Sequence, residues 1–171
     1  MYTTRIGYVH LKVHQLDRSI DFYTRYLGLK LTERRGDQYA FLSGDDSHHE
    51  IALQSVGPQT PQPSCYGTGL YHIAFQAADQ DTLAQAYQTL TAGGVQVTPV
   101  DHVISWAIYF CDPDGNGLAV YWDTRDEPGG DRLWRGRNVS LPGDRILAAL
   151  EHKTQESKDK ETASWIVQAQ K

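Results

Sequence analysis

The chain has 171 residues, of which 40% are hydrophobic and 22% are charged, and its formal net charge is −5 at pH 7. This composition is ordinary for a globular protein of one domain or two small modules that share a core. The negative charge argues against binding to nucleic acid or to an anionic membrane, and no stretch resembles a signal peptide or a membrane span. Cys65 and Cys111 are far apart in the sequence, so we expect two small buried or idle thiols in a reducing cytoplasm.

Two stretches, residues 7–13 and 69–75, share the pattern Gly-x-x-His-aliphatic-x-apolar. Each alternates as a β-strand does. Helical patterns follow at 17–27 and 81–90, each with an aspartate at its start and glycine after its end. The chain therefore contains an internal repeat that begins with a strand and a helix.

Three further strands are predicted in each half of the chain. They cover 29–33, 38–43 and 50–54 in the first half, and 95–99, 105–110 and 118–122 in the second. The order β-α-β-β-β occurs twice, which predicts an α+β fold with βαβββ modules at about 5–56 and 67–125, joined by a linker at 57–66.

A single βαβββ module leaves an edge of its curved sheet open, so we expect the two modules to pair into one open, barrel-like cleft within residues 1–125. The repeat equates His10 with His72. It also equates Ala52 with Ala119. Strand alternation then predicts that all four positions face the cleft.

Residues 126–171 form a C-terminal extension with a different composition. A loop leads to a short helix near 144–152, and a nearly all-polar tail follows from residue 153. The apolar segment 165–167 is either a docking or dimer contact or part of a mobile tail. We expect the protein to be a homodimer.

Residues 109–122 read Tyr-Phe-Cys-Asp-Pro-Asp-Gly-Asn-Gly-Leu-Ala-Val-Tyr-Trp, which predicts two strands joined by a tight turn. This stretch closely resembles the last signature of the vicinal-oxygen-chelate superfamily, which contains glyoxalases, bleomycin-resistance proteins and extradiol ring-cleaving dioxygenases. The resemblance covers about residues 5–125 and is strongest to single-domain type I extradiol dioxygenases of the catechol 2,3-dioxygenase type. It implies the paired-module fold and a metal-dependent reaction.

The resemblance also implies the metal ligands. His10 and His72 stand where the extradiol branch has two histidine ligands, and Ala119 stands where it has a glutamate ligand. Neutral imidazole is a common ligand in mixed nitrogen and oxygen sites. The implied metal is Fe(II), with Mn(II) as the alternative, and O2 is the implied co-substrate.

Three further residues are implied in catalysis. His49, in the stretch 48–52, resembles the acid–base histidine of extradiol dioxygenases, although two adjacent histidines also suit a solvated turn. His102 and Tyr109 follow the spacing of the extradiol signature, in which they hydrogen-bond the substrate or bound oxygen. Alternation along one strand would put His102 and Tyr109 on opposite faces, so we expect a bulge or turn near Ser105 to re-aim one of them.

The two alanines separate the branches of the superfamily. Ala52 removes a fourth ligand that glyoxalase-type relatives usually carry. Ala52 and Ala119 together leave that branch without both acidic ligands, so an isomerase or lyase of that type ranks last. Ala119 removes the carboxylate and leaves a metal site that is impaired or inactive, with Glu50 and Tyr121 as the available substitutes. Either the chain is a naturally degenerate member, or a functional glutamate has been replaced; the otherwise complete set of site residues favours replacement.

The predicted function is ring cleavage of a catechol-like aromatic diol, impaired by Ala119. The alternative is a non-catalytic small-molecule binding protein of the bleomycin-resistance type, which holds an aromatic or antibiotic ligand. Four aromatic side chains suit such a pocket, although buried aromatics are more often simple core: Tyr8, Tyr71, Trp106 and Trp122.

Overall fold

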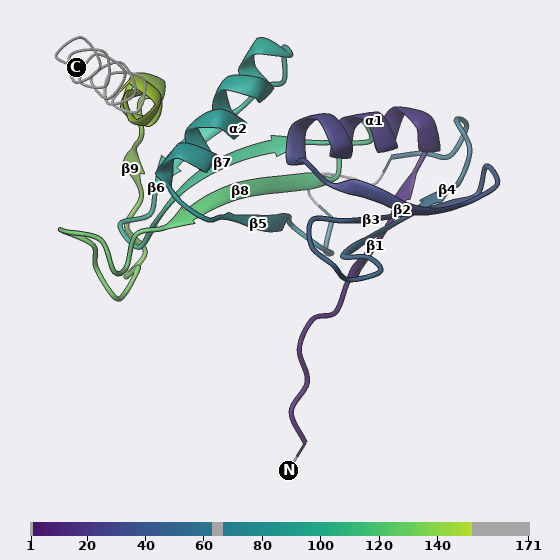
Figure 1. Ribbon diagram of the computed structural model, residues 1–171, viewed down its shortest axis with the longest axis horizontal. Helices are drawn as coiled ribbons and strands as arrows, with labels where there is room; N and C mark the ends of the chain where they lie inside the picture. The colour runs from purple at the N-terminus through teal and green to yellow at the C-terminus, as the bar shows by residue number, and fades with distance from the viewer. Residues whose placement is uncertain (1, 63–66, 152–171) are drawn as a thin grey trace, which may run out of the picture. The chain divides into compact units, whose positions relative to one another are not determined.

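The computed structural model describes residues 2–62 and 67–151 (Figure 1). The chain divides into two compact units, Met1–Ile73 with Cys111–Leu118, and Ala74–Phe110 with Ala119–Lys171. Cys65 and the apolar segment 165–167 lie outside the described residues, so the expectations about them stay predictions. Cys111 is a free, exposed cysteine.

The first βαβββ module has the predicted order of elements. It consists of β1 (Val9–Val13), α1 (Leu16–Leu27), β2 (Lys30–Arg35), β3 (Tyr39–Ser43) and β4 (Ile51–Ser55). Its four strands form one sheet in the order β1-β4-β3-β2. β1 runs parallel to β4, whereas β3 runs antiparallel to both of its neighbours.

Helix α1 covers one face of this sheet (Figure 1). Its buried side chains recur with helical spacing, which makes one side of the helix apolar: Leu16, Ser19, Ile20, Phe22 and Tyr23. On the sheet, the buried side chains alternate with exposed ones, as in Leu11 and Val13 of β1. The helix ends at Gly28, whose φ of 67° is the left-handed conformation that glycine adopts without strain.

The second module repeats this order and adds one strand. It consists of β5 (Ile73–Ala77), α2 (Gln80–Ala92), β6 (Thr98–Asp101), β7 (Ser105–Cys111) and β8 (Gly117–Asp123), followed later by β9 (Val139–Ser140). The sheet order is β5-β8-β7-β6-β9. β5 begins at Ile73 rather than at the predicted residue 69, and β9 was not predicted.

Helix α2 lies over one face of the second sheet (Figure 1). Its first turn is capped by Asp79, whose carboxylate accepts a hydrogen bond from the Thr82 backbone N–H at 2.8 Å. Leu83 and Leu90 form the buried side of the helix. Residues 143–151 are helical, in agreement with the short helix predicted near 144–152.

The predicted α+β class and the two βαβββ modules are therefore confirmed, with one sheet of four strands and one of five. The pairing of the modules around one cleft, and the homodimer, stay predictions. No helix in the described part of the chain is long and apolar enough to cross a membrane.

Candidate functional site

The face of the first sheet opposite α1 carries one row of side chains. His10 of β1 pairs with Ala52 of β4, Ala52 pairs with Phe41 of β3, and Phe41 pairs with Glu33 of β2. Residues paired across neighbouring strands point to the same face of a sheet. His10 is exposed on this face, whereas Ala52 is buried within it.

His49 lies just before β4, among aromatic rings. Its ring centroid is 4.5 Å from that of Tyr8 and 5.0 Å from that of Phe41. Its Nδ1 is 2.8 Å from Nδ1 of His48, and Nε2 of His48 is 3.1 Å from a Glu33 carboxylate oxygen. A neutral His48 that donates from Nε2 to Glu33 must accept at Nδ1, so His49 donates from its own Nδ1. In this state Nε2 of His49 is a proton acceptor, as an acid–base role requires.

His72 directly precedes β5, with its ring centroid 5.4 Å from that of Tyr71. Its backbone lies against the start of β8. A Cβ atom added to Gly117 would stand 2.2 Å from the Tyr71 carbonyl oxygen and 3.4 Å from the His72 Cα atom. Because Gly117 has no side chain, the backbone at His72 can approach the start of β8 closely. Gly117 stands two residues before Ala119 in the sequence.

The structure brings His102 and Tyr109 together. The Tyr109 hydroxyl is 2.7 Å from Nε2 of His102, and the two rings meet edge to face with centroids 5.8 Å apart. His102 follows β6 and Tyr109 lies within β7. The sequence predicted this pair of residues as substrate-orienting groups, and that role stays a prediction.

The expected turn near Ser105 is the physical reason for this contact. β6 and β7 are antiparallel with Val100 opposite Ala107, and the His102 backbone N–H bonds the Ser105 carbonyl at 2.8 Å. Only two residues separate His102 from Ser105, and the first of them, Val103, has a φ of 70°. His102 therefore stands opposite Ser105, and residues opposite each other on paired strands point to the same face. Alternation along β7 then puts Ala107 and Tyr109 on that face as well.

Two residues of the C-terminal extension complete this cluster. Nδ1 of His102 is 2.6 Å from Oδ1 of Asn138, and Nε1 of Trp134 is 3.1 Å from the same oxygen. The pairing of β9 with β6 places Val139 opposite Asp101, so the next position puts Asn138 opposite His102. Sequence reasoning missed both residues because a two-residue strand carries no periodic signal.

Ala119 belongs to the same face. Counted outward from the hairpin ends at Cys111 and Gly117, Tyr109 and Ala119 stand at matching positions on β7 and β8. Ala119 is 1% exposed. The face of the second sheet that carries Ala119 and Tyr109 thus also carries His102, just after β6, and Asn138, just before β9.

Two of the four aromatic residues suggested for a ligand pocket lie on the other face of the second sheet. Trp106 and Trp122 contact each other edge to face at 5.5 Å, and alternation places them on the opposite face of the sheet from Tyr109. There the Arg145 guanidinium lies 4.6 Å above the Trp106 ring. Tyr8 and Tyr71 are 56% and 86% exposed. The tryptophans therefore line the covered side of their sheet.

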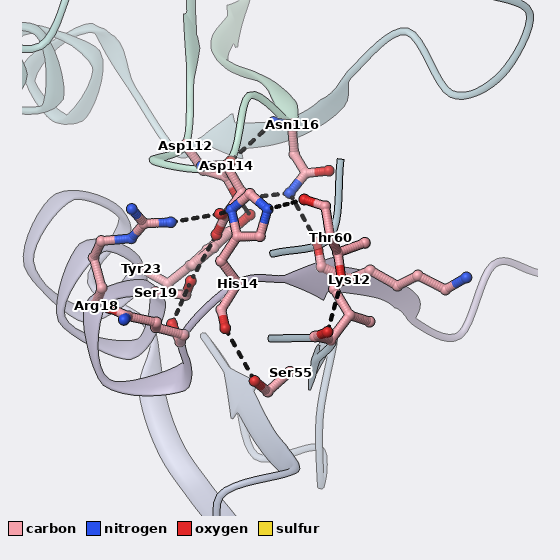
Figure 2. A network of polar contacts seen from close by, with 12 residues as sticks. Lys12, His14, Arg18, Ser19, Tyr23, Ser55, Thr60, Asp112, Asp114 and Asn116 are labelled. Atoms are coloured by element: carbon pink, nitrogen blue, oxygen red, sulfur yellow. Dashed lines mark hydrogen bonds and ion pairs between the residues drawn. The ribbon is translucent and has the colours of Figure 1, made fainter. Parts of the chain in front are cut away.

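The turn at 112–116 is held by a network of polar contacts (Figure 2). Asp112 accepts hydrogen bonds at Oδ1 from the backbone N–H groups of Asp114, at 2.9 Å, and Asn116, at 2.8 Å. Its Oδ2 accepts from the Tyr23 hydroxyl of α1 at 3.0 Å. Burial, together with the Asp112 carboxylate, holds the pKa of Tyr23 far above its ordinary value.

Asp114 carries a second set of contacts to the same unit (Figure 2). Its carboxylate is paired with the Arg18 guanidinium, lies 2.5 Å from Nδ1 of His14 and accepts from the Ser19 hydroxyl at 3.3 Å. The other nitrogen of His14 is 2.7 Å from the Thr60 carbonyl oxygen. The turn is thereby fastened to α1 and to the segment after β4, which explains its place in the first unit.

The residues at the three implied ligand positions do not complete a metal site. His10 and His72 offer imidazoles, but the methyl group of Ala119 has no lone pair. Glu50 accepts from a backbone N–H at 2.9 Å and the Tyr121 hydroxyl donates to a glutamine of β5 at 3.2 Å, so both substitutes are engaged elsewhere. In the described part of the chain, no three His, Cys, Asp or Glu side chains are placed to hold an ion together.

Comparison with known proteins gives a consistent family assignment. The sequence model of the Glyoxalase/Bleomycin resistance protein/Dioxygenase superfamily matches residues 5–120. A catechol-2,3-dioxygenase of Bacillus subtilis is 30% identical over 86% of this chain, which spans 58% of that relative's length. A lactoylglutathione lyase of Escherichia coli O157:H7 is 28% identical over 65% of the chain and 87% of its own length.

A solved structure supports the same assignment. The glyoxylase/bleomycin resistance protein/dioxygenase domain from Frankia sp. EAN1pec is 25% identical, with a TM-score of 0.62. The match covers 77% of this chain and all of that domain.

Proposed function

The chain belongs to the glyoxalase/bleomycin resistance protein/dioxygenase superfamily, and we propose that it is an extradiol-dioxygenase-type protein that binds a catechol-like aromatic diol. Relatives in this superfamily include enzymes of both the dioxygenase and the lyase kind. The proposal assigns this chain to the dioxygenase kind, with ring cleavage impaired by Ala119. The likeness to a catechol dioxygenase over most of the chain supports it.

The observation that carries the proposal is the hydrogen bond between Tyr109 and His102, at 2.7 Å, on the face that also holds Ala119. A phenol oxygen backed by an imidazole can hold or move a proton at the oxygen of a bound diol. His49, whose Nε2 accepts a proton when a neutral His48 donates to Glu33, is the candidate base for a substrate hydroxyl.

Fe(II), or Mn(II) as the alternative, would supply the activation of O2 and the chelation of the diol in this branch. His10 and His72 alone leave that site without its carboxylate, so no step of ring cleavage is assigned to this chain as it stands. What remains to its own side chains is to bind the diol, orient it and accept its proton. The homodimer and the cytoplasmic location are likewise proposals.

The test restores the carboxylate. We expect Ala119→Glu, loaded anaerobically with Fe(II) and offered a panel of catechols, to consume O2 and form a ring-fission product, and the unchanged chain to do so far more slowly. Ala119→Leu is the matched control, since it fills the same buried position without supplying a carboxylate. It should show no gain.

No O2 uptake and no ring-fission product from Ala119→Glu with any catechol would count against the dioxygenase proposal. The methyl group of Ala119 specifically favours one other function, a non-catalytic binding protein. In that case the unchanged chain should bind an aromatic ligand with an affinity that chelators do not alter, and metal analysis should find no bound ion.

A further inference from the structure

We propose that Asn138 is a positioning residue that fixes the tautomer of His102 and, through it, the direction of the Tyr109 hydroxyl. The consequence for ligands, which rests on the proposed function, is that this part of the site selects a diol with a free hydroxyl and discriminates against its methyl ether. The contact chain Trp134–Asn138–His102–Tyr109 carries the argument.

The first step is the orientation of the Asn138 amide. Nε1 of Trp134 lies 2.7 Å from the Arg137 carbonyl oxygen and 3.1 Å from Oδ1 of Asn138. The indole N–H can only donate, so the side-chain atom that it meets is the amide oxygen rather than the NH2 group. Trp134 therefore aims an acceptor at His102.

The second step is the tautomer of His102. An amide oxygen can only accept, and Nδ1 of His102 lies 2.6 Å from it, so Nδ1 carries the proton. A neutral imidazole with its proton on Nδ1 has an acceptor at Nε2. The Tyr109 hydroxyl, 2.7 Å from Nε2, is then the donor of that bond.

The third step concerns the ligand. A phenol whose proton is committed to an imidazole can only accept a hydrogen bond from any further group. A catechol hydroxyl beside Tyr109 can donate such a bond, but a methoxy group in its place cannot. The geometry thus favours a diol over its monomethyl ether at this position.

The C-terminal extension places Asn138 beside His102. The short strand β9 pairs with β6, and its register sets Asn138 opposite His102. The rings of Trp134 and His102 also contact each other edge to face, with centroids 6.2 Å apart. Positioning of the site residues therefore depends on a segment beyond the repeated modules.

15N NMR of the histidine imidazoles in the full chain tests the proposal directly. The His102 signals are those that disappear in His102→Gln. We expect the neutral ring of His102 to be protonated at Nδ1. Asn138→Leu should shift the proton to Nε2, whereas Asn138→Asp, which keeps an acceptor oxygen, should leave it on Nδ1. Trp134→Phe, which frees the amide to rotate, should give a mixture of the two tautomers.

A binding measurement provides the second readout. In the unchanged chain catechol should bind more tightly than 2-methoxyphenol, and Asn138→Leu should reduce that ratio by about two- to tenfold, the effect of one neutral hydrogen bond. Asn138→Asp is the control that should preserve it.

A proton on Nε2 of His102 in the unchanged chain, or a tautomer that does not respond to Asn138→Leu, would overturn the proposal. Equal binding of both ligands by the unchanged chain would overturn the selection of a free hydroxyl. A proton on Nδ1 that responds as expected, in a chain that binds no diol at all, would support the positioning role and reject the proposed function instead.

Discussion

The Tyr23 hydroxyl donates a hydrogen bond to the Asp112 carboxylate at 3.0 Å, although the two residues are 89 positions apart. Tyr23 has no exposed surface and Asp112 is 5% exposed. This bond joins the middle of α1 to the turn between β7 and β8 (Figure 2). The turn therefore depends on a helix of the first module for its conformation.

Removal of that hydroxyl should destabilise the protein. In Tyr23→Phe the buried carboxylate of Asp112 loses a hydrogen bond from a fixed donor, and we expect a loss of about 1–3 kcal/mol in the free energy of unfolding. Urea denaturation measures it. Tyr26→Phe, on the same helix, is the control, because its ring contacts with Phe22 and Arg25 are kept. An equal loss in both variants would contradict this account.

The raised pKa of Tyr23 predicts an alkaline loss of stability. The folded state holds the phenol protonated, whereas in the unfolded chain it ionises near its ordinary pKa of 10.0. Above that pH the unfolded state binds fewer protons than the folded state, so stability falls as pH rises. The unchanged chain should lose stability above about pH 10 more steeply than Tyr23→Phe does. Parallel profiles for the two proteins would exclude this contribution.

Asp114 should matter more than an ion pair on the surface. In Asp114→Asn the charge that faces Arg18 and His14 is lost inside the unit, and we expect about 1–3 kcal/mol of destabilisation by urea denaturation. Asp126→Asn removes a carboxylate that is 82% exposed and is paired with Arg132, so little change is expected. The reverse ranking of the two variants would refute this reasoning.

Gly117 should tolerate no side chain. The Cβ atom of Gly117→Ala would stand 2.2 Å from the Tyr71 carbonyl oxygen, which is backbone and cannot move aside cheaply. We expect a loss of about 1–3 kcal/mol or more, measured as a lower Tm and urea midpoint. Gly69→Ala, where a Cβ atom meets nothing within 4 Å, is the matched control. Unchanged stability in Gly117→Ala would show that the approach of the two segments is looser than described.

The glutamate introduced to restore activity should also report on metal binding without any reaction. Ala119 is 1% exposed, so Ala119→Glu should lower stability by about 1–3 kcal/mol in the absence of metal, the cost of burying a polar group. Fe(II) or Mn(II) should then raise its Tm in proportion to the logarithm of metal concentration, since binding favours the folded state. An unchanged Tm with both ions would count against a metal site made of these three positions.

Much of the fold could be predicted from the sequence because the modules repeat. Alternating residues and helix-ending glycines located both helices and the strands of the first module to within two residues. The second module was located less well, since β5 begins only at Ile73 and places His72 outside the strand. β9 escaped prediction because two residues that pair with a distant strand have no local pattern.

Some residues of the candidate site could likewise be predicted from the sequence, and others could not. His102 and Tyr109 were found by their spacing, and their contact follows from a hairpin whose parity must be counted across the turn. Asn138 and Trp134 could not be found, because their proximity to His102 depends on a strand pairing 36 residues away in the sequence. The network at Asp112 and Asp114 was also hidden, since a turn motif does not indicate which helix will bind it.

The contacts of the turn at 112–116 show that its sequence serves the fold rather than the reaction. Its aspartates bind Tyr23, Arg18 and backbone N–H groups, all of which concern how the chain folds. Ala119 takes part in none of these contacts. The sequence Asp-Pro-Asp-Gly-Asn therefore reports on how this turn folds, whereas the side chain at position 119, three residues after Asn116, determines whether a carboxylate is present.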